Sequence, residues 1–134
     1  MKIAVSACLL GENCRYDGGN CYREQIEELL KGHEIVAICP EKMAGLSTPR
    51  IPCEIFNGRV LRQDGKDITE QLEAGVQKAL NQIGDVQLCV LKSYSPTCGH
   101  GSIYDGTFQK RRIQGSGLFA KALKDKGILI VEVD

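Results

Sequence analysis

An apolar stretch near the amino end reads Lys2-Ile3-Ala4-Val5-Ser6-Ala7-Cys8-Leu9-Leu10-Gly11. It is rich in residues that are favoured in β-strands, and it stops abruptly at a cysteine and a glycine before a polar segment begins. Two later stretches repeat this pattern. Residues 34–38 run into Cys39, and residues 86–91 run into a polar loop that contains Cys98. The sequence therefore predicts three buried strands, each followed by a cysteine.

A helix is predicted between the first two strands, over residues 22–32. Its evidence is the spacing of Ile26, Leu29 and Leu30, which places all three side chains on one face of a helix. Gly32 stands where this helix should end, because glycine adopts the left-handed conformation that terminates many helices.

Two further helices are predicted in the second half of the chain. Asp67-Ile68-Thr69-Glu70 is typical of a capping box at a helix start, and Gly84 is placed to end that helix. Ser116 is predicted to cap a last helix, which ends at Gly127. The apolar residues 128–133 that follow predict a final strand.

The segment over residues 40–55 is predicted to be an extended, ordered loop without helix. Three prolines interrupt it, at Pro40, Pro49 and Pro52, and proline is unfavourable inside a helix. Directly after this segment, Asn57-Gly58 stands between two short strand-like pieces, which is the strongest short signal for a β-hairpin. Long ordered loops beside a sheet often carry function.

Strands that alternate with helices predict an α/β fold, a three-layer Rossmann-like domain with a mainly parallel sheet. The length of 134 residues suits one domain, so residues 1–134 are expected to form a single unit. In open parallel sheets, ligands bind at the carboxyl ends of the strands. This rule would bring Cys8, Cys39 and Cys98 to the same rim of the sheet.

The composition is ordinary for a globular protein and excludes several classes of partner. Lys and Arg number 17, Asp and Glu also number 17, and the net charge is zero, so no nucleic-acid surface is expected. No apolar stretch approaches a membrane span, so no membrane association is expected either. Seven cysteines without a secretory signal favour the cytoplasm and thiol chemistry over disulfides. The oligomeric state stays open.

The three cysteines at predicted strand ends have two interpretations. They could hold a metal or an iron-sulfur cluster, or they could be structural, because their spacing matches no short zinc or ferredoxin motif. Three thiolates on a 4Fe-4S cluster leave one iron open to act as a Lewis acid on a substrate. Cys89 lies inside a strand-like run and is predicted to be a buried apolar residue, whereas Cys14, Cys21 and Cys53 are unassigned.

Five polar residues near these cysteines are candidates for the chemistry. Glu41 could serve as a base or proton shuttle, or it could be an exposed loop carboxylate. Ser95 and Ser102 could donate hydroxyl hydrogen bonds, or they could stabilise turns. Lys92 and Arg50 could neutralise an anionic substrate or cluster, or they could extend into water.

Two other functions compete with a cluster enzyme. The segment from Cys8 to Arg15 is similar to the phosphate-binding loop of low-molecular-weight tyrosine phosphatases and arsenate reductases. That loop places five residues between its cysteine and arginine, whereas six separate them here, and backbone amides that converge on one phosphate tolerate no insertion. The third possibility is a metal-binding module without catalysis.

Five motifs taken together resemble the DUF523 family, and the chain is identified as a member from them. They occur in the family's order and extend over nearly the whole sequence. The motifs are Ser6-Ala7-Cys8-Leu9-Leu10-Gly11, Arg15-Tyr16-Asp17-Gly18, Cys39-Pro40-Glu41 with Gly45-Leu46 and Pro49-Arg50, Lys92 with Ser95-Pro96-Thr97-Cys98-Gly99, and Ile103-Tyr104-Asp105-Gly106-Thr107-Phe108.

The resemblance implies an enzyme of the thiouracil desulfidase type. Such enzymes remove sulfur from 2-thiouracil without net redox change and use a 4Fe-4S cluster held by three cysteines, whose fourth iron takes the substrate sulfur. Carried over by motif, the ligands would be Cys8, Cys39 and Cys98, with Glu41 and Ser95 in the catalytic roles. The expected partner is therefore a small thiolated molecule, although the resemblance does not fix which one.

Overall fold

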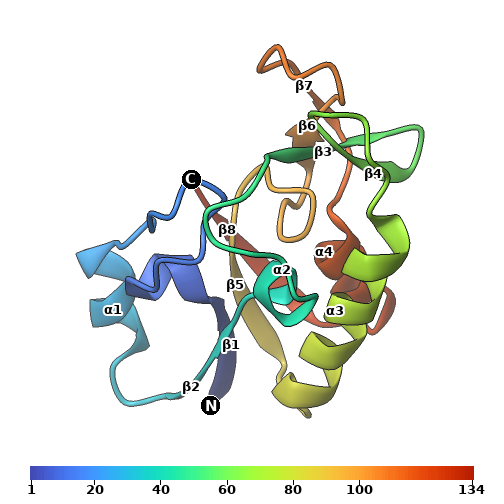
Figure 1. Ribbon diagram of the computed structural model, residues 1–134. Coiled ribbons are helices and arrows are strands. Elements are labelled where there is room, and N and C mark those ends of the chain that lie inside the picture. Colours follow the sequence, from blue (N-terminus) through green and yellow to red (C-terminus); the bar gives the residue numbers. More distant parts are fainter.

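A four-stranded parallel sheet forms the centre of the structure, a computed structural model that describes residues 1–134. Its strands lie in the order β2-β1-β5-β8, and every neighbouring pair is parallel. They are β1 (Lys2–Ser6), β2 (Glu34–Ile38), β5 (Leu88–Lys92) and β8 (Leu129–Val133). The predicted parallel sheet is thereby confirmed, with the opening stretch of the chain at its centre (Figure 1).

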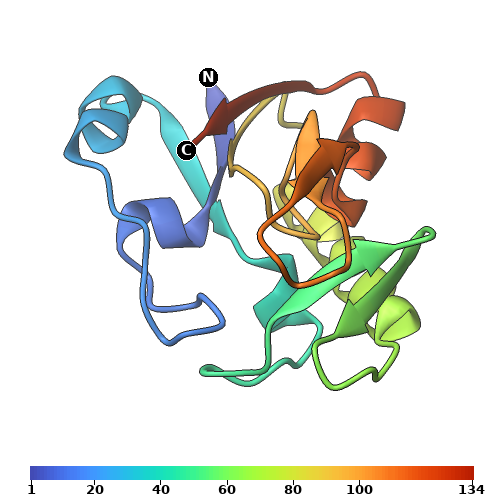
Figure 2. The same cartoon turned by 90° about the horizontal axis from the view of Figure 1, so that it is seen from above.

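Helices cover both faces of the sheet. Helix α1 (Glu24–Leu30) lies on one face, and the helices α3 (Thr69–Ile83) and α4 (Leu118–Asp125) lie on the other, as both views show (Figures 1 and 2). Successive residues of β1 serve the two layers in turn: Ile3 packs in the cluster on the α1 side and Ala4 in the cluster under α3 and α4. The predicted three-layer Rossmann-like fold is confirmed.

Two small hairpins stand above the carboxyl ends of the strands (Figure 1). The first joins β3 (Cys53–Phe56) to β4 (Arg59–Arg62), and the second joins β6 (Ser102–Tyr104) to β7 (Arg112–Gln114). Asn57-Gly58 forms the first turn with φ values of 50° and 76°, as a two-residue hairpin requires. The β6–β7 hairpin was not predicted, because its strands are only three residues long and β7 is exposed on every residue.

The prediction of a helix-free loop after Cys39 was wrong. Pro40 begins the one-turn helix α2 (Pro40–Met43). Proline is tolerated at the first helical position, because its missing N–H would have no partner there and its fixed φ suits the helix. The helix is short, but it sets the direction of Glu41 relative to Cys39.

Two predicted helix starts were also wrong in detail. Ser116 caps nothing; the first amides of α4 donate instead to the carbonyl oxygens of Pro96 and Thr97, at 2.9 Å in both cases. At the start of α3, Asp67 accepts from the amide and hydroxyl of Thr69, whereas Glu70 pairs with Arg59 and does not complete the box. The first amides of α4 and the Glu70 carboxylate therefore bind partners that are distant in the sequence.

Helix α1 is shorter than predicted. It has only 7 residues, and Leu29 is 75% exposed, whereas Leu30 is buried. A helix this short covers only part of the sheet face, and Leu29 lies beyond the covered part. Among the helices of the structure, none is long and apolar enough to span a membrane.

Helix α3 packs closely on α2, and Gly75 makes this possible. A Cβ at Gly75 would meet the carbonyl oxygen of Pro40 and would lie 2.7 Å from the amide nitrogen of Ala44. Both are backbone atoms and cannot rotate away. The absence of a side chain at this position therefore lets α3 hold α2 in place. It thereby fixes the position of the Glu41 backbone in α2.

We predict that Gly75→Ala destabilises the protein by about 1–3 kcal/mol through overpacking. An exposed Gly→Ala change in a helix has the opposite sign, a gain of about 1 kcal/mol. The free energy of unfolding in urea measures the effect. Gln77→Ala, on the exposed side of the same helix, is the control and should change it by less than about 0.5 kcal/mol. A stabilised Gly75→Ala variant would contradict the close contact.

Candidate active site

One cavity of about 360 Å³ opens at the carboxyl ends of β1, β2 and β5. Its volume lies in the range of small-molecule sites. The predicted site residues that line it are Cys8, Cys39, Glu41, Arg50, Lys92, Ser95 and Cys98. Ser102 is the exception: it lies in β6, paired with Gln114, and is not part of the lining.

The three strand-end cysteines reach this cavity through different local structures. Cys8 lies in the 3-10 turn η1 (Ala7–Leu10), which follows β1 directly and ends at Gly11 with φ 96°. Cys39 is the extended residue between β2 and α2. Cys98 lies in the turn after β5, where the hydroxyl oxygen of Ser95 accepts its amide at 2.7 Å. All three thiols are free.

Burial and contact with other thiols raise the pKa values of Cys39 and Cys98. Burial raises the pKa of Cys98 to about 12. A hydrogen bond with Cys14, followed by burial, raises the pKa of Cys39 well above its usual range. Binding to iron would require these protons to leave, and a metal ion supplies the positive charge that makes this favourable.

The donor set suits a cluster better than a single ion. No three His, Cys, Asp or Glu side chains converge closely enough to hold one metal ion. Cys8, Cys39 and Cys98 nevertheless line one cavity, and each iron of a 4Fe-4S cluster needs only one thiolate from the protein. These three residues therefore fit a cluster with one iron left free of protein ligands.

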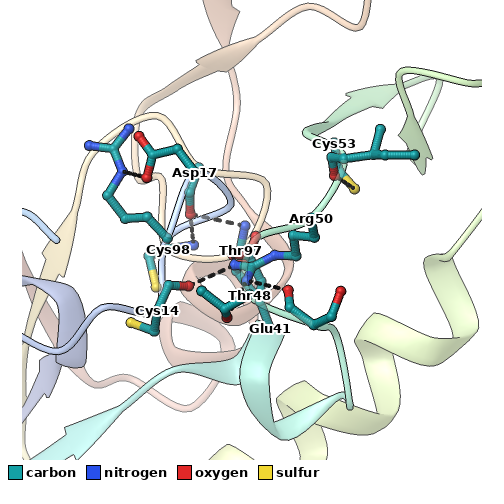
Figure 3. Close-up of polar contacts among 12 residues, drawn as sticks. Cys14, Asp17, Glu41, Thr48, Arg50, Cys53, Thr97 and Cys98 are labelled. Carbon is teal, nitrogen blue, oxygen red and sulfur yellow. Dashed lines mark hydrogen bonds and ion pairs between the residues drawn. The ribbon is translucent and has the colours of Figure 1, made fainter. Parts of the chain in front are cut away.

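Glu41 is held at both carboxylate oxygens. The Arg50 guanidinium donates to Oε2 at 2.6 Å, and the Thr97 hydroxyl donates to Oε1 at 2.9 Å (Figure 3). The Arg50 side chain is only 7% exposed and that of Glu41 21%. The same guanidinium also donates to the carbonyl oxygen of Cys14 at 2.9 Å, so Arg50 connects Glu41 to the loop that follows η1. Arg50 is thus occupied by protein contacts.

Ser95 lies against Cys98. Its oxygen accepts the amides of Thr97 and Cys98 at 3.2 and 2.7 Å. Hydrogen bonds from the hydroxyls of Ser6 and Ser95 to the Cys98 sulfur oppose the rise of the Cys98 pKa. Ser95 therefore shapes the turn and also presents a hydroxyl at the cavity.

Aromatic and cationic side chains form the outer wall. The Lys92 ammonium donates to the Ser93 hydroxyl at 3.2 Å and lies 5.9 Å from the centre of the Tyr94 ring. The Arg112 guanidinium, which does not itself line the cavity, lies 4.2 Å from the centre of the same ring, and Tyr104, which does, packs on it with centroids 6.0 Å apart. Such a wall suits a flat, polar ring as a ligand.

Several lining residues escaped the sequence reasoning, among them Tyr94, Tyr104, Thr97 and Cys14. Thr97 directly precedes Cys98, and this position next to a candidate ligand could have pointed to it. No local pattern, however, indicates that the Thr97 side chain reaches Glu41. Cys14 was left unassigned, although its thiol contacts those of Cys39 and Cys8. Cys89 is fully buried in β5, as predicted, and Cys53 lies on the far side of Arg50 from Cys14 (Figure 3).

The phosphate-loop alternative finds no support in the geometry. Cys8 lies within a 3-10 turn and not at the start of an open anion-binding loop. Arg15 turns to other partners: its guanidinium donates to the Cys21 sulfur at 3.0 Å and lies 3.6 Å from the Asp17 carboxylate. The cysteine and the arginine therefore do not share an anion.

We predict that Arg50→Ala lowers the free energy of unfolding by about 2–4 kcal/mol, because Glu41 would remain largely buried without its cation. Urea denaturation monitored by circular dichroism measures this. The matched control is Arg59→Ala, whose ion pairs with Asp67 and Glu70 are exposed and should contribute about 1 kcal/mol or less. Equal losses in the two variants would show that the buried Arg50 pair stabilises the fold no more than an exposed ion pair does.

Comparison with known proteins shows the family of the chain. Residues 3–134 match the model of the 2-thiouracil desulfurase family. The uncharacterized protein YbbK of Bacillus subtilis (strain 168) is 38% identical over 141 residues, covering 96% of this chain and 93% of YbbK. The structure of the [4Fe-4S]-dependent thiouracil desulfidase TudS (DUF523Vcz) superimposes with a TM-score of 0.89 at 36% identity, over 98% of this chain and 89% of that one. The chain belongs to the 2-thiouracil desulfurase family.

Proposed function

We propose that this protein is a 4Fe-4S-dependent desulfidase that hydrolyses the C=S group of a thiouracil-like heterocycle. In the net reaction, water replaces sulfur at carbon, the product carries C=O, and hydrogen sulfide leaves, with no change of oxidation state. The observation that carries the proposal is that Cys8, Cys39 and Cys98 line one cavity together with Glu41 and Ser95. Family membership and the likeness to the TudS structure support it.

The three cysteines would hold the cluster in the cavity at the rim of the sheet. When bound, the cluster supplies an iron without a protein ligand, a Lewis acid with affinity for sulfur. Hydroxyl groups of Ser6 and Ser95 already donate to the Cys98 sulfur, and the amide of Lys42 donates to that of Cys39. Hydrogen bonds of this kind stabilise thiolates and orient them as ligands.

Glu41 would move the protons. Its two oxygens are fixed by Arg50 and Thr97, so the carboxylate cannot turn away from the cavity. Each carboxylate oxygen can accept a second hydrogen bond, so both contacts leave room for a water molecule. In the proposed role, Glu41 takes a proton from the attacking water and returns one to the departing sulfur or the ring nitrogen.

Ser95, Lys92 and the aromatic wall would bind the substrate. The Ser95 hydroxyl can donate to a ring carbonyl or sulfur, and the Lys92 ammonium favours the negative charge that develops during attack. Tyr94 and Tyr104 offer faces on which a flat heterocycle can stack.

The proposal includes the setting of the enzyme. We treat residues 1–134 as one domain and a small thiolated molecule as its partner, without nucleic acid. Seven cysteines that are all free suit a reducing compartment, which favours the cytoplasm.

Anaerobic reconstitution with iron and sulfide should load about four irons per chain and produce visible charge-transfer absorption. Replacing Cys8, Cys39 and Cys98 together by Ala should abolish iron uptake, because the ligands are gone. Cys53→Ala, at a cysteine assigned no ligand role, is the control and should load normally. Equal iron uptake by the triple variant would overturn the ligand assignment.

In the loaded enzyme, Glu41→Gln should lower the rate of 2-thiouracil desulfidation about 10²- to 10⁴-fold, because glutamine transfers no proton. The iron content and the visible spectrum should stay unchanged, since Glu41 is not assigned as a ligand. Release of hydrogen sulfide and formation of uracil measure the reaction. Loss of the cluster in this variant would assign Glu41 a structural role, and full activity would remove it from the mechanism.

A further inference from the structure

The loop that follows η1 is fastened to the segment that begins with Cys39. The Lys42 ammonium pairs with the Glu12 carboxylate at 2.7 Å. The Arg50 guanidinium binds the Cys14 carbonyl oxygen at 2.9 Å and Glu41 at 2.6 Å (Figure 3). Both bridges join the loop around Cys14 to the segment that follows Cys39, so the fold holds these two segments together.

The two thiols contact each other at the cavity. Cys14 belongs to the buried cluster on which Cys39 packs, both residues line the cavity, and the two thiols are close enough to influence each other. Cys14 is buried at 3% exposure, whereas Cys39 is half-buried and faces the cavity. Cys8 is a second neighbour of Cys14, but Cys98 lies in the other core cluster.

We propose that Cys14 is the resolving cysteine of Cys39: in the cluster-free protein, a hydroperoxide that enters the cavity converts the pair into a reversible Cys14–Cys39 disulfide. Nothing in the cluster chemistry requires Cys14. The disulfide itself does not depend on the proposed function, but its consequence for cluster assembly rests on it, because Cys39 is assigned as a ligand there.

The reaction balances with hydrogen peroxide as the oxidant. The Cys39 thiol loses its proton and its sulfur attacks one peroxide oxygen. The O–O bond breaks, and the hydroxide that leaves takes up that proton, so the products are Cys39 sulfenic acid and water. The Cys14 sulfur then attacks the sulfenic sulfur, the S–S bond forms, and the hydroxyl group leaves with the Cys14 proton as a second water. In total, the two thiols lose two electrons and one hydrogen peroxide molecule takes them up.

Such a disulfide protects Cys39 and does not act as a fast sensor. Cys14 is buried and Cys39 half-buried, so a peroxide reaches the pair slowly. Without a nearby thiol, however, a cysteine sulfenic acid proceeds to sulfinic acid, which thiols do not reduce.

The test uses the cluster-free chain and hydrogen peroxide in excess. Free thiols are alkylated afterwards, and peptides from a non-reducing digest are identified by mass spectrometry. Wild type should yield Cys14 and Cys39 peptides joined with the loss of two hydrogens, and dithiothreitol should release them. Cys53→Ala, which changes another half-buried cysteine of the cavity, should behave like wild type.

In Cys14→Ala and Cys14→Ser, no linked peptide should form and Cys39 should appear as sulfinic or sulfonic acid. The serine variant guards against a packing defect of the alanine variant. A wild-type chain that shows Cys39 sulfinic acid without the linkage, or a linkage of Cys14 to Cys8, would overturn the proposal.

Iron uptake separates this proposal from the proposed function. After peroxide and then dithiothreitol, wild type should regain its original iron loading, whereas the Cys14 variants should regain less than half. If untreated wild type loads no iron at all, the cluster function fails while the peptide map still decides the disulfide. Equal recovery in wild type and both Cys14 variants would remove any protective role for Cys14.

Discussion

The ion pair between Arg50 and Glu41 is the contact on which the arrangement of the site depends. It is nearly buried, and its guanidinium also holds the loop at Cys14. Three segments far apart in sequence meet there: the loop after β1, the start of α2, and the turn before Cys98, which contributes Thr97. A buried charge without its partner is costly, so these segments hold one another in place.

The packing beneath this pair explains its rigidity. Gly75 lets α3 approach the backbone of α2, and the Ser95–Cys98 turn provides the carbonyl groups that accept the first amides of α4. The catalytic candidates thus lie on short segments that are each anchored to a helix. A site on loops gains precision in this way, because the supporting elements cannot shift independently.

Much of the site could be predicted from the sequence, because one rule of topology governs it. Parallel strands end at a common rim, so cysteines directly after strand-like runs were expected to meet, and Cys8, Cys39 and Cys98 do line one cavity. The clear patterns in the chain, such as Asn57-Gly58, were also confirmed. The weak ones failed: a three-residue strand such as β7 carries too few residues to show an alternation.

The sequence by itself determined the α/β class, the parallel sheet and the rim on which the three cysteines lie, since periodicity and strand-end position are local properties of the chain. Only the tertiary structure decided the partners of each side chain. Arg50 binds Glu41 and not an open substrate site, Ser102 lies away from the cavity, and Cys14 meets Cys39. The physical reason is that hydrogen bonds and ion pairs act over a few ångströms between segments whose separation along the chain carries no information about their distance in space.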